Sequence, residues 1–554
     1  MATSNRGRKL DLRTADSRPR LPRVGLLCVS ALVATWACGG PTATELPTSG
    51  APAAVSPSLP PTVTGRLTVG IEYAYPEAAD VFRDSGATSA KPYPALSPWQ
   101  VVQPQPDSDF QWDVVDRFVL AFQEAGFPHL TLMMRGESLW ASQDPPRPPT
   151  NRGDTTVKPD YEAEFADYIQ AYVERYDGDG ADDMPGLLFP VLLYGFEPEY
   201  STYVPGSAAG YIHMLELIYP AVKRANPAAQ LMPAGLLFTT VFEGYPTQED
   251  IARRLADPDE RIFDKSPEDI GLLLDRPELF DVVDVHVLAD YTEIIPLAGW
   301  LRQEMARRGY SKPIWIGDTF GGATLNGYGP AACPGGPRTS IIGYPATEAD
   351  RCEVAAALEA LRNASDPDHD QAIGWIRAES AAGTVRKIMV AAGEGLAGIN
   401  MGNVEDWEVL MLTLGGAGTS PWQGMIDRDL FSKRFRGYRP AYYALKQAAD
   451  LVAASDSVVR MPGYDERTYV YEVRLTDGSV HFVVWADIGL WLPGDPMPTR
   501  PVRIPIASGG PVGVEWTVTS GDEPVREELP VVDGFVEIEV GSAPAFLFPA
   551  TPGS

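Results

Sequence analysis

Short apolar runs alternate with amphipathic stretches through the middle of the chain. Helical spacing is clearest in residues 161–176, where large apolar side chains recur every three or four positions. Eight apolar runs are typical of buried strands: residues 67–73, 86–91, 129–134, 187–196, 230–238, 280–288, 313–316 and 396–401. Strands that alternate with helices in this way predict an α/β fold, a (β/α)8 barrel. An open doubly wound sheet is the alternative, but no glycine-rich phosphate loop follows the first strand.

The hydrophobic pattern changes to period two after residue 453. The runs 468–475 and 479–485 flank Asp477-Gly478, which is a strong signal for a β-hairpin. Four more short strands are expected: residues 502–506, 512–518, 535–540 and 545–548. The sequence therefore predicts a barrel in residues 65–453 and a small all-β sandwich, an accessory domain, in residues 454–554.

The first 64 residues differ from the rest of the chain. Several basic side chains precede an apolar stretch, Val24 to Ala37, which suits the core of a signal peptide and is short for a membrane span. Cys38 follows a small residue, as in a bacterial lipoprotein processing site. Residues 39–64 are rich in Pro, Ser and Thr and predict a disordered linker. We expect an export segment in residues 1–38 and a protein of the bacterial envelope or extracellular space, with Cys38 as its lipid anchor.

Charge and cysteine content narrow the function further. The 554 residues carry a net charge of −29 without a basic stripe, which argues against nucleic-acid binding. Two cysteines remain beyond the export segment, Cys333 and Cys352. In an oxidising compartment they are expected to form a disulfide, and two unpaired thiols are the alternative.

Carboxylates follow two of the predicted strands. Glu197 and Glu199 come directly after the fourth apolar run, and Asp318 follows the seventh. Residues two apart on a strand point the same way, and parallel α/β folds place their chemistry where strands end. These side chains are therefore candidates for acid–base chemistry on a polar substrate, and a solvated acidic turn is the alternative for the glutamate pair.

A second acidic group lies in the turn that follows the helix of residues 161–176. Asp177, Asp179 and Asp183 alternate there with glycines, as in loops that bind calcium through oxygen ligands. We expect either a structural calcium site or a plain acidic turn. The histidines share no zinc-ligand spacing, so no catalytic zinc is expected.

Two segments resemble the clan A glycoside hydrolases, the retaining (β/α)8 glycosidases that include cellulases and β-xylosidases. They are residues 175–199, which approach and end the fourth strand, and Lys312–Thr319 around the seventh. The resemblance implies that Glu199 is the acid/base, or Glu197 in a second register, and that Asp318 is the nucleophile. The acid protonates the leaving oxygen while the ionised carboxylate attacks the anomeric carbon.

The same resemblance implies a carbohydrate substrate and no required cofactor. The substrate-binding candidates are His286, Arg135, Trp140, Trp407 and Trp422. Pro198 stands where the family has an amide, and Asp318 is one methylene shorter than the family's glutamate. The predicted function is thus an exported glycoside hydrolase, and a non-catalytic glycan-binding surface lipoprotein on the same barrel is the alternative.

Overall fold

The computed structural model describes most of the chain beyond residue 65. The described residues are 66–93, 96, 98–147, 152–196, 208–238, 241–257, 266–322, 356–357, 359–406, 422–429, 432, 434–489, 491–507 and 510–549. The predicted export segment and linker lie outside these ranges. Six candidate residues also lie outside them: Cys38, Glu197, Glu199, Cys333, Cys352 and Trp407.

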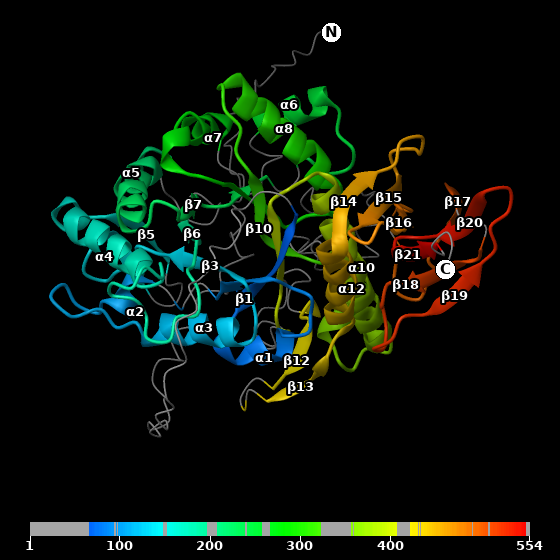
Figure 1. The fold of residues 1–554 in the computed structure, drawn as a ribbon, viewed down its shortest axis with the longest axis horizontal. Helices are drawn as coiled ribbons and strands as arrows, with labels where there is room; N and C mark the ends of the chain where they lie inside the picture. Colours follow the sequence, from blue (N-terminus) through cyan, green and yellow to red (C-terminus); the bar gives the residue numbers. More distant parts are fainter. Residues whose placement is uncertain are drawn as a thin grey trace, which may run out of the picture.

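A curled sheet of parallel strands, surrounded by helices, forms the body of the molecule (Figure 1). Its strands are β1 (Thr68–Ala74), β2 (Ser89–Pro92), β3 (His129–Met134), β6 (Leu193–Phe196), β7 (Gln230–Met232), β8 (Leu236–Leu237), β9 (Val283–Val287), β10 (Ile314–Phe320) and β11 (Gly398–Gly402). The order of pairing is β7-β6-β3-β2-β1-β11-β10-β9-β8. β7 and β8 are consecutive pieces of one run, so the nine strands occupy eight strand positions, as in a (β/α)8 barrel. The predicted (β/α)8 fold is confirmed.

The largest differences from the predicted strand bounds occur in three strands. Residues 230–238 divide into β7 and β8 because Pro233, between them, has no N–H for a ladder hydrogen bond. Residues 187–196 form a strand only from Leu193, after Pro190. The seventh strand is longer than predicted, so Asp318 lies within β10 instead of beyond its end.

Side-chain alternation separates the inside of the barrel from its outer layer. The outward residues of β9, Val283, Val285 and Val287, join the main core beneath the helices. The inward residues at the amino end are apolar: Leu193, Met232, Val282 and Trp315 form one small cluster. The inward residues nearer the carboxyl ends include Asp284, His286 and Asp318, so apolar side chains fill the amino end of the barrel and polar side chains line its mouth.

Helices surround the barrel. They are α1 (Ala79–Phe82), α2 (Trp99–Val102), α3 (Asp113–Glu124), α4 (Glu162–Glu174), α5 (Ala208–Ala225), α6 (Gln248–Ala256), α7 (Pro267–Leu274), α8 (Ile294–Arg307), α10 (His369–Gly393) and α12 (Pro440–Ala454). The sequence pattern predicts a helix only from Ala378, nine residues after α10 begins. That helix is buried over most of its surface, so it lacks the single apolar stripe on which the prediction relied.

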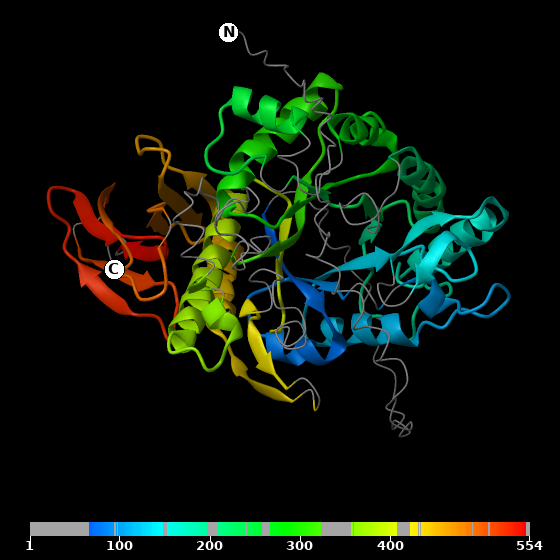
Figure 2. The same ribbon diagram turned by 180° about the vertical axis from the view of Figure 1, so that it is seen from behind.

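Antiparallel sheets complete the C-terminal part, beside α10 and α12 (Figures 1 and 2). Their strands are β14 (Ser455–Arg460), β15 (Thr468–Leu475), β16 (Val480–Ala486), β17 (Arg500–Pro505), β18 (Val512–Trp516), β19 (Arg526–Leu529), β20 (Phe535–Val540) and β21 (Ala545–Pro549). Six of them form one sheet, and β17 and β20 form a second sheet that covers a shared apolar core. The predicted all-β character is confirmed, and β14 and β19 were not predicted.

The barrel and the β sheets share apolar and polar contacts. Tyr469, Tyr471 and Trp485 belong to the same core cluster as the barrel helices. The Trp491 indole N–H donates to Glu379 of α10 over 2.7 Å. Within the described part of the chain, no helix is both long and apolar enough to cross a membrane.

Candidate active site

Asp318 lies at the barrel mouth because β10 contains a bulge. Ile316 pairs with Val285 of β9, yet the next partner pair is Asp318 with His286, so one extra residue is inserted at Gly317. Without that insertion, alternation from the inward Trp315 would turn Asp318 outward. Bulges next to active sites commonly redirect a side chain in this way. Asp318 is 6% exposed and lies beside its strand partner His286 at the mouth.

Tyr73 of β1 holds the Asp318 carboxylate. Its hydroxyl donates to Asp318 Oδ2 over 2.7 Å. Its backbone has φ of 60°, a left-handed conformation that is costly for a tyrosine and is typical of functional sites. Stacking on Phe320, with ring centroids 5.9 Å apart, and contact with Tyr93 hold the ring in place. Tyr73 was not among the candidates from sequence.

His286 is buried in the barrel wall next to Asp318. Its ring fills the space beside Gly235, where an added Cβ would come within 2.0 Å of Nε2. Asp284, two residues earlier on the same face, accepts from the Gly317 N–H over 2.9 Å and lies 3.8 Å from His286 Nε2. Asp284 therefore fixes the bulge that carries Asp318, while His286 lies beside the carboxylate.

A buried ion pair forms the floor beneath these groups. Lys91 Nζ of β2 lies 3.1 Å from Glu72 Oε1 of β1, and both side chains are inaccessible to solvent. The same ammonium donates to the Gly317 carbonyl over 3.0 Å. Two strands on the far side of β11 thus hold the peptide that precedes Asp318.

Lys387 of α10 supports the site from outside the barrel. Its ammonium donates to the carbonyls of Val287 and Ala289 and to Thr319 Oγ1, over 2.7–3.0 Å. Burial lowers the pKa of Lys387 to about 8, against the opposing effect of nearby Glu293 and Asp290. The cation ties the carboxyl ends of β9 and β10 together behind Asp318.

Glu405 is a mouth carboxylate that the sequence analysis missed. It follows β11 and accepts a hydrogen bond from Tyr75 over 2.8 Å. Arg428 lies 3.7 Å from the same carboxylate and stacks over the Tyr75 ring. Burial and the charge of Glu405 raise the pKa of Tyr93 to about 12, so Glu405 also lies near the residue that follows β2. Glu405 follows a strand end, as Glu199 does, so the same sequence criterion identifies it as a candidate.

Arg135 and Trp140 lie near the carboxyl end of β3, within local networks. Arg135 Nε donates to both oxygens of Glu137, over 2.9 and 3.1 Å, so its charge is already compensated. Trp140 packs edge-on against Trp99 and Tyr161, and its indole N–H donates to the Gln103 carbonyl. These contacts explain both residues as parts of the rim, and sugar binding by them stays a prediction.

Trp422 lines a separate cavity beyond β11, together with Arg377, Asp406 and Arg439. The side chain is 6% exposed. Its neighbour Gln423 accepts from the Gly322 N–H, just past β10, over 3.0 Å. The residue after Trp422 therefore contacts the end of β10 at the mouth, whereas the Trp422 side chain forms part of the wall of this cavity.

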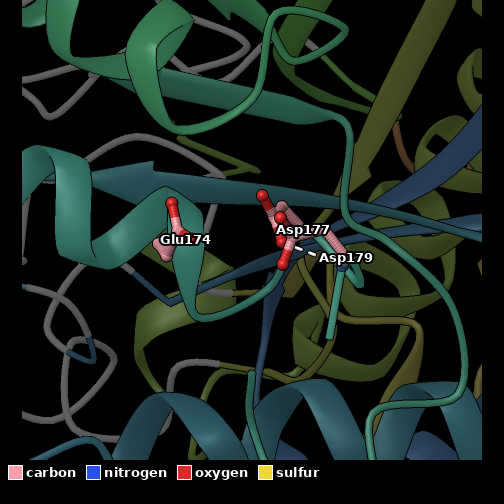
Figure 3. A group of neighbouring side chains, drawn as sticks. All are labelled: Glu174, Asp177 and Asp179. Atoms are coloured by element: carbon pink, nitrogen blue, oxygen red, sulfur yellow. Dashed lines mark hydrogen bonds between the residues drawn. The ribbon is translucent and has the colours of Figure 1, made fainter. Parts of the chain in front are cut away.

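The acidic turn precedes the amino end of β6, on the side away from the mouth. Figure 3 shows its side chains Glu174, Asp177 and Asp179. Carboxylate oxygens of Glu174, Asp177 and Asp179 lie within 4.8 Å of one another. The Asp183 carboxylate accepts from the N–H groups of Gly178 and Gly180, over 2.9 and 2.8 Å. Burial raises the pKa of Asp177 to about 6. Backbone donors therefore explain Asp183 without an ion, and calcium binding by Asp177, Asp179 and Asp183 stays a prediction.

This architecture places the chain in a structural class: it has the fold of the clan A glycoside hydrolases. No protein-family model matches the chain, and no curated protein matches its sequence. A family 39 glycoside hydrolase from Bacteroides cellulosilyticus WH2 superposes with a TM-score of 0.53 at 14% identity, over 90% of this chain and 83% of that one.

Two further solved structures agree. A glucosidase from Croceicoccus marinus matches with a TM-score of 0.50 at 12% identity, over 88% of this chain and 96% of that one. A monomeric β-xylosidase from Caulobacter crescentus CB15 matches with a TM-score of 0.50 at 12% identity, over 88% and 98%. At these identities the likeness establishes the fold alone.

Proposed function

We propose that this protein is a glycoside hydrolase that cleaves O-glycosidic bonds with Asp318 as one of two catalytic carboxylates. The observation that carries the proposal is the position of Asp318, which a strand bulge turns into the mouth of the barrel, where Tyr73 donates to it. The carboxyl ends of barrel strands are where enzymes of this architecture keep their chemistry. The solved structures that share the fold are named as glycoside hydrolases, a glucosidase and a β-xylosidase.

The proposed reaction divides two roles between two strand ends. Asp318, ionised and held by Tyr73, attacks the anomeric carbon, and the glycosidic C–O bond breaks as a proton passes to the leaving oxygen. Glu199 is our proposed proton donor, with Glu197 as the alternative, since both follow β6. Water then releases the sugar from Asp318, and the same glutamate accepts a proton from that water.

We extend the proposal to the location of the protein, using the export features of residues 1–64. The basic and apolar segment before Cys38 and the Pro/Ser/Thr-rich linker support a protein held at the bacterial envelope by a lipid on Cys38. A lipid-anchored glycosidase would meet its carbohydrate substrate outside the cytoplasm. A disulfide between Cys333 and Cys352 belongs to the same proposal.

The test is a screen of aryl glycosides and polysaccharides with the full chain, run beside the Glu199→Gln, Glu197→Gln and Asp318→Asn variants. We expect release of phenol or reducing sugar, abolished by Asp318→Asn and by one of the two glutamate variants. Sugar binding without turnover in the wild-type protein, unchanged by the carboxylate variants, would instead establish the non-catalytic glycan-binding alternative.

A further inference from the structure

A cavity of about 280 Å³ lies beside the barrel mouth, beyond β11. Its wall includes three arginines from separate segments, Arg362, Arg377 of α10 and Arg439 just before α12, together with Asp406 and Trp422. The volume is several times the ~30 Å³ that one water occupies in the liquid. Basic side chains therefore converge on an accessible space in a chain whose net charge is −29.

Each of these arginines has a buried donor that is not used within the protein. Arg362 Nη2, Arg377 Nε and Arg439 Nε have no hydrogen-bond partner among the described residues. Buried polar groups are nearly always paired, so these three guanidinium donors around one cavity call for a partner that is not among the described residues. A water can satisfy single donors, but only an anion also compensates the charge.

Four arginines line the cavity against only two carboxylates, Asp406 and Asp427, so the lining itself carries a net positive charge. Asp406 is shared between Arg377 and Arg439, at 3.4 and 3.3 Å. Asp427 lies between Arg439 and a fourth arginine, Arg436, at 2.9 and 3.4 Å, and Arg436 is also paired with Asp429. Arg362 pairs with Glu359, which is 47% exposed and so is screened by solvent.

The fold adds to the positive potential. His369, Ile373 and Arg377 line the cavity at intervals of four residues, on one stripe of the first turns of α10. The amino end of a helix carries partial positive charge from unpaired N–H groups. Burial lowers the pKa of Arg377 despite the nearby Asp406, and Arg439 contributes to that lowering.

The cavity adjoins the active face through two consecutive residues. Glu405 contacts Tyr75, which follows β1 at the mouth, whereas Asp406 contacts Arg377 and Arg439 in the cavity. A sugar chain that leaves the mouth over β11 would reach this wall next. Arginine is also the residue best suited to carboxylates and sulfates, because its fork donates two parallel hydrogen bonds.

We propose that Arg362, Arg377 and Arg439 form an oxyanion-binding subsite that accepts a carboxylate or sulfate group. The group is either carried on a sugar chain that extends from the mouth or supplied by a free inorganic anion. The binding itself does not depend on hydrolysis, so the subsite can be tested whether or not the proposed function holds.

The experiment measures binding by calorimetry with the full chain, using inorganic sulfate, glucuronate and neutral glucose as probes. We expect at least one anion to bind and Arg362→Gln to weaken that binding about tenfold or more, as loss of a charge-assisted pair implies. Arg302→Gln is the matched control, because Arg302 pairs with Glu394 just past the other end of α10 and should leave affinity unchanged. Glucose binding, if present, should not respond to Arg362→Gln.

A second variant keeps the test sound if an arginine variant folds poorly. Asp427→Asn removes a negative charge from the cavity wall and should tighten anion binding severalfold. Tighter binding of glucuronate than of sulfate assigns the subsite to an acidic sugar, and the reverse order assigns it to a free anion. Absence of anion binding, or affinity unchanged in both Arg362→Gln and Asp427→Asn, would overturn the proposal.

Discussion

Asp318 and Asp177 are both buried carboxylates, but they lie at opposite ends of the barrel and are held differently. The donor to Asp318 is a tyrosine hydroxyl 245 positions away in the sequence. The donor to Asp177 is the N–H of Asp179, two residues on, and Asp183 is likewise satisfied by N–H groups of its own turn. The position of Asp318 therefore depends on a contact between distant barrel strands, whereas that of Asp177 depends on its own turn.

The difference indicates which acidic cluster can do chemistry. A carboxylate that accepts hydrogen bonds from its own loop stabilises the conformation of that loop. Asp318 is held by side chains from other strands at the mouth, where a substrate can approach. We therefore expect substitutions at the mouth to change turnover more than stability, and substitutions at the amino end to do the reverse.

The largest effect is expected from Asp318→Asn. Asparagine keeps the shape and can still accept the Tyr73 hydrogen bond, but it cannot attack as a carboxylate. The rate of glycoside cleavage should fall roughly 100- to 10,000-fold while the thermal midpoint changes little. Steady-state kinetics and calorimetry on the same preparations measure the two quantities.

Asp281→Asn is the matched control at the amino end of β9. Asp281 accepts from the Leu231 N–H over 2.9 Å and pairs with Lys223. Its substitution should lower the free energy of unfolding by about 1 kcal/mol and leave turnover intact. An equal loss of turnover in both variants would remove the contrast between the two ends.

Tyr73→Phe should give the next largest effect. It deletes the hydroxyl that donates to Asp318 and leaves the ring stacked on Phe320. Hydrogen bonds to charged groups contribute about 1.5–3 kcal/mol, so kcat should fall roughly 10- to 100-fold. Tyr75→Phe, which deletes the donor to Glu405, distinguishes a specific effect at Asp318 from a general loss of order at the mouth. Equal kcat values for Tyr73→Phe and wild type would show that the hydrogen bond has no catalytic role.

A smaller effect, on stability, is expected from Asp177→Asn. Burial raises the folded-state pKa of Asp177 to about 6 from 3.8. The protonated side chain therefore stabilises the fold below pH 4, and that contribution is lost as the pH rises through 6. Above pH 6 the variant should be more stable than wild type by about 1–2 kcal/mol, less than the full pKa difference because solvent screens the turn.

Adding calcium to the comparison of wild type with Asp177→Asn tests whether the acidic turn binds the ion. Binding at Glu174, Asp177 and Asp179 would raise the wild-type thermal midpoint and reverse the order of the two proteins above pH 6. No response to millimolar calcium would favour the plain acidic turn. Chemical unfolding at pH 4 and pH 8, with and without calcium, separates these outcomes.

The smallest effect concerns His213 on the outer face of the barrel. Its hydrogen bond to Glu162, which joins α5 to α4, raises the pKa of the imidazole. The stabilisation is present below the ordinary histidine pKa and is lost as the pH rises through the folded-state value. Since the side chain is 44% exposed, His213→Gln should cost about 0.5 kcal/mol or less at pH 5 and nothing at pH 9. A larger loss, or one that persists at pH 9, would assign His213 a packing role.

Hydrophobic periodicity predicted the fold well because the buried face of most barrel strands and helices is visible in the spacing of their apolar residues. His129–Met134 and Phe535–Val540 form strands with the predicted bounds. Prediction failed where burial on several sides erased the pattern, as in α10, and where Pro233 divided a strand. The local turn of Asp177 could be recognised from neighbouring residues alone.

The site was only partly predictable, for the same physical reason. Asp318 and His286 were recognised as residues near strand ends, and the structure brings them side by side. The roles of Tyr73, Lys387 and the arginines of the cavity beyond β11 depend on contacts between residues far apart in the sequence. Hydrophobic period and motif spacing do not encode such contacts. The bulge at Gly317 had only the glycine as a signal. Glu405 lies three residues past β11, and the sequence prediction after that strand was the aromatic residue Trp407.

The central claim is that Asp318 is the carboxylate that meets the anomeric carbon, and rescue of an Asp318→Ala variant by azide tests it most directly. The small anion can occupy the space of the missing carboxylate and attack in its place. The account predicts that Asp318→Ala loses glycoside cleavage and that azide restores part of it, with a glycosyl azide as the product. Full activity of Asp318→Ala without azide would contradict the account.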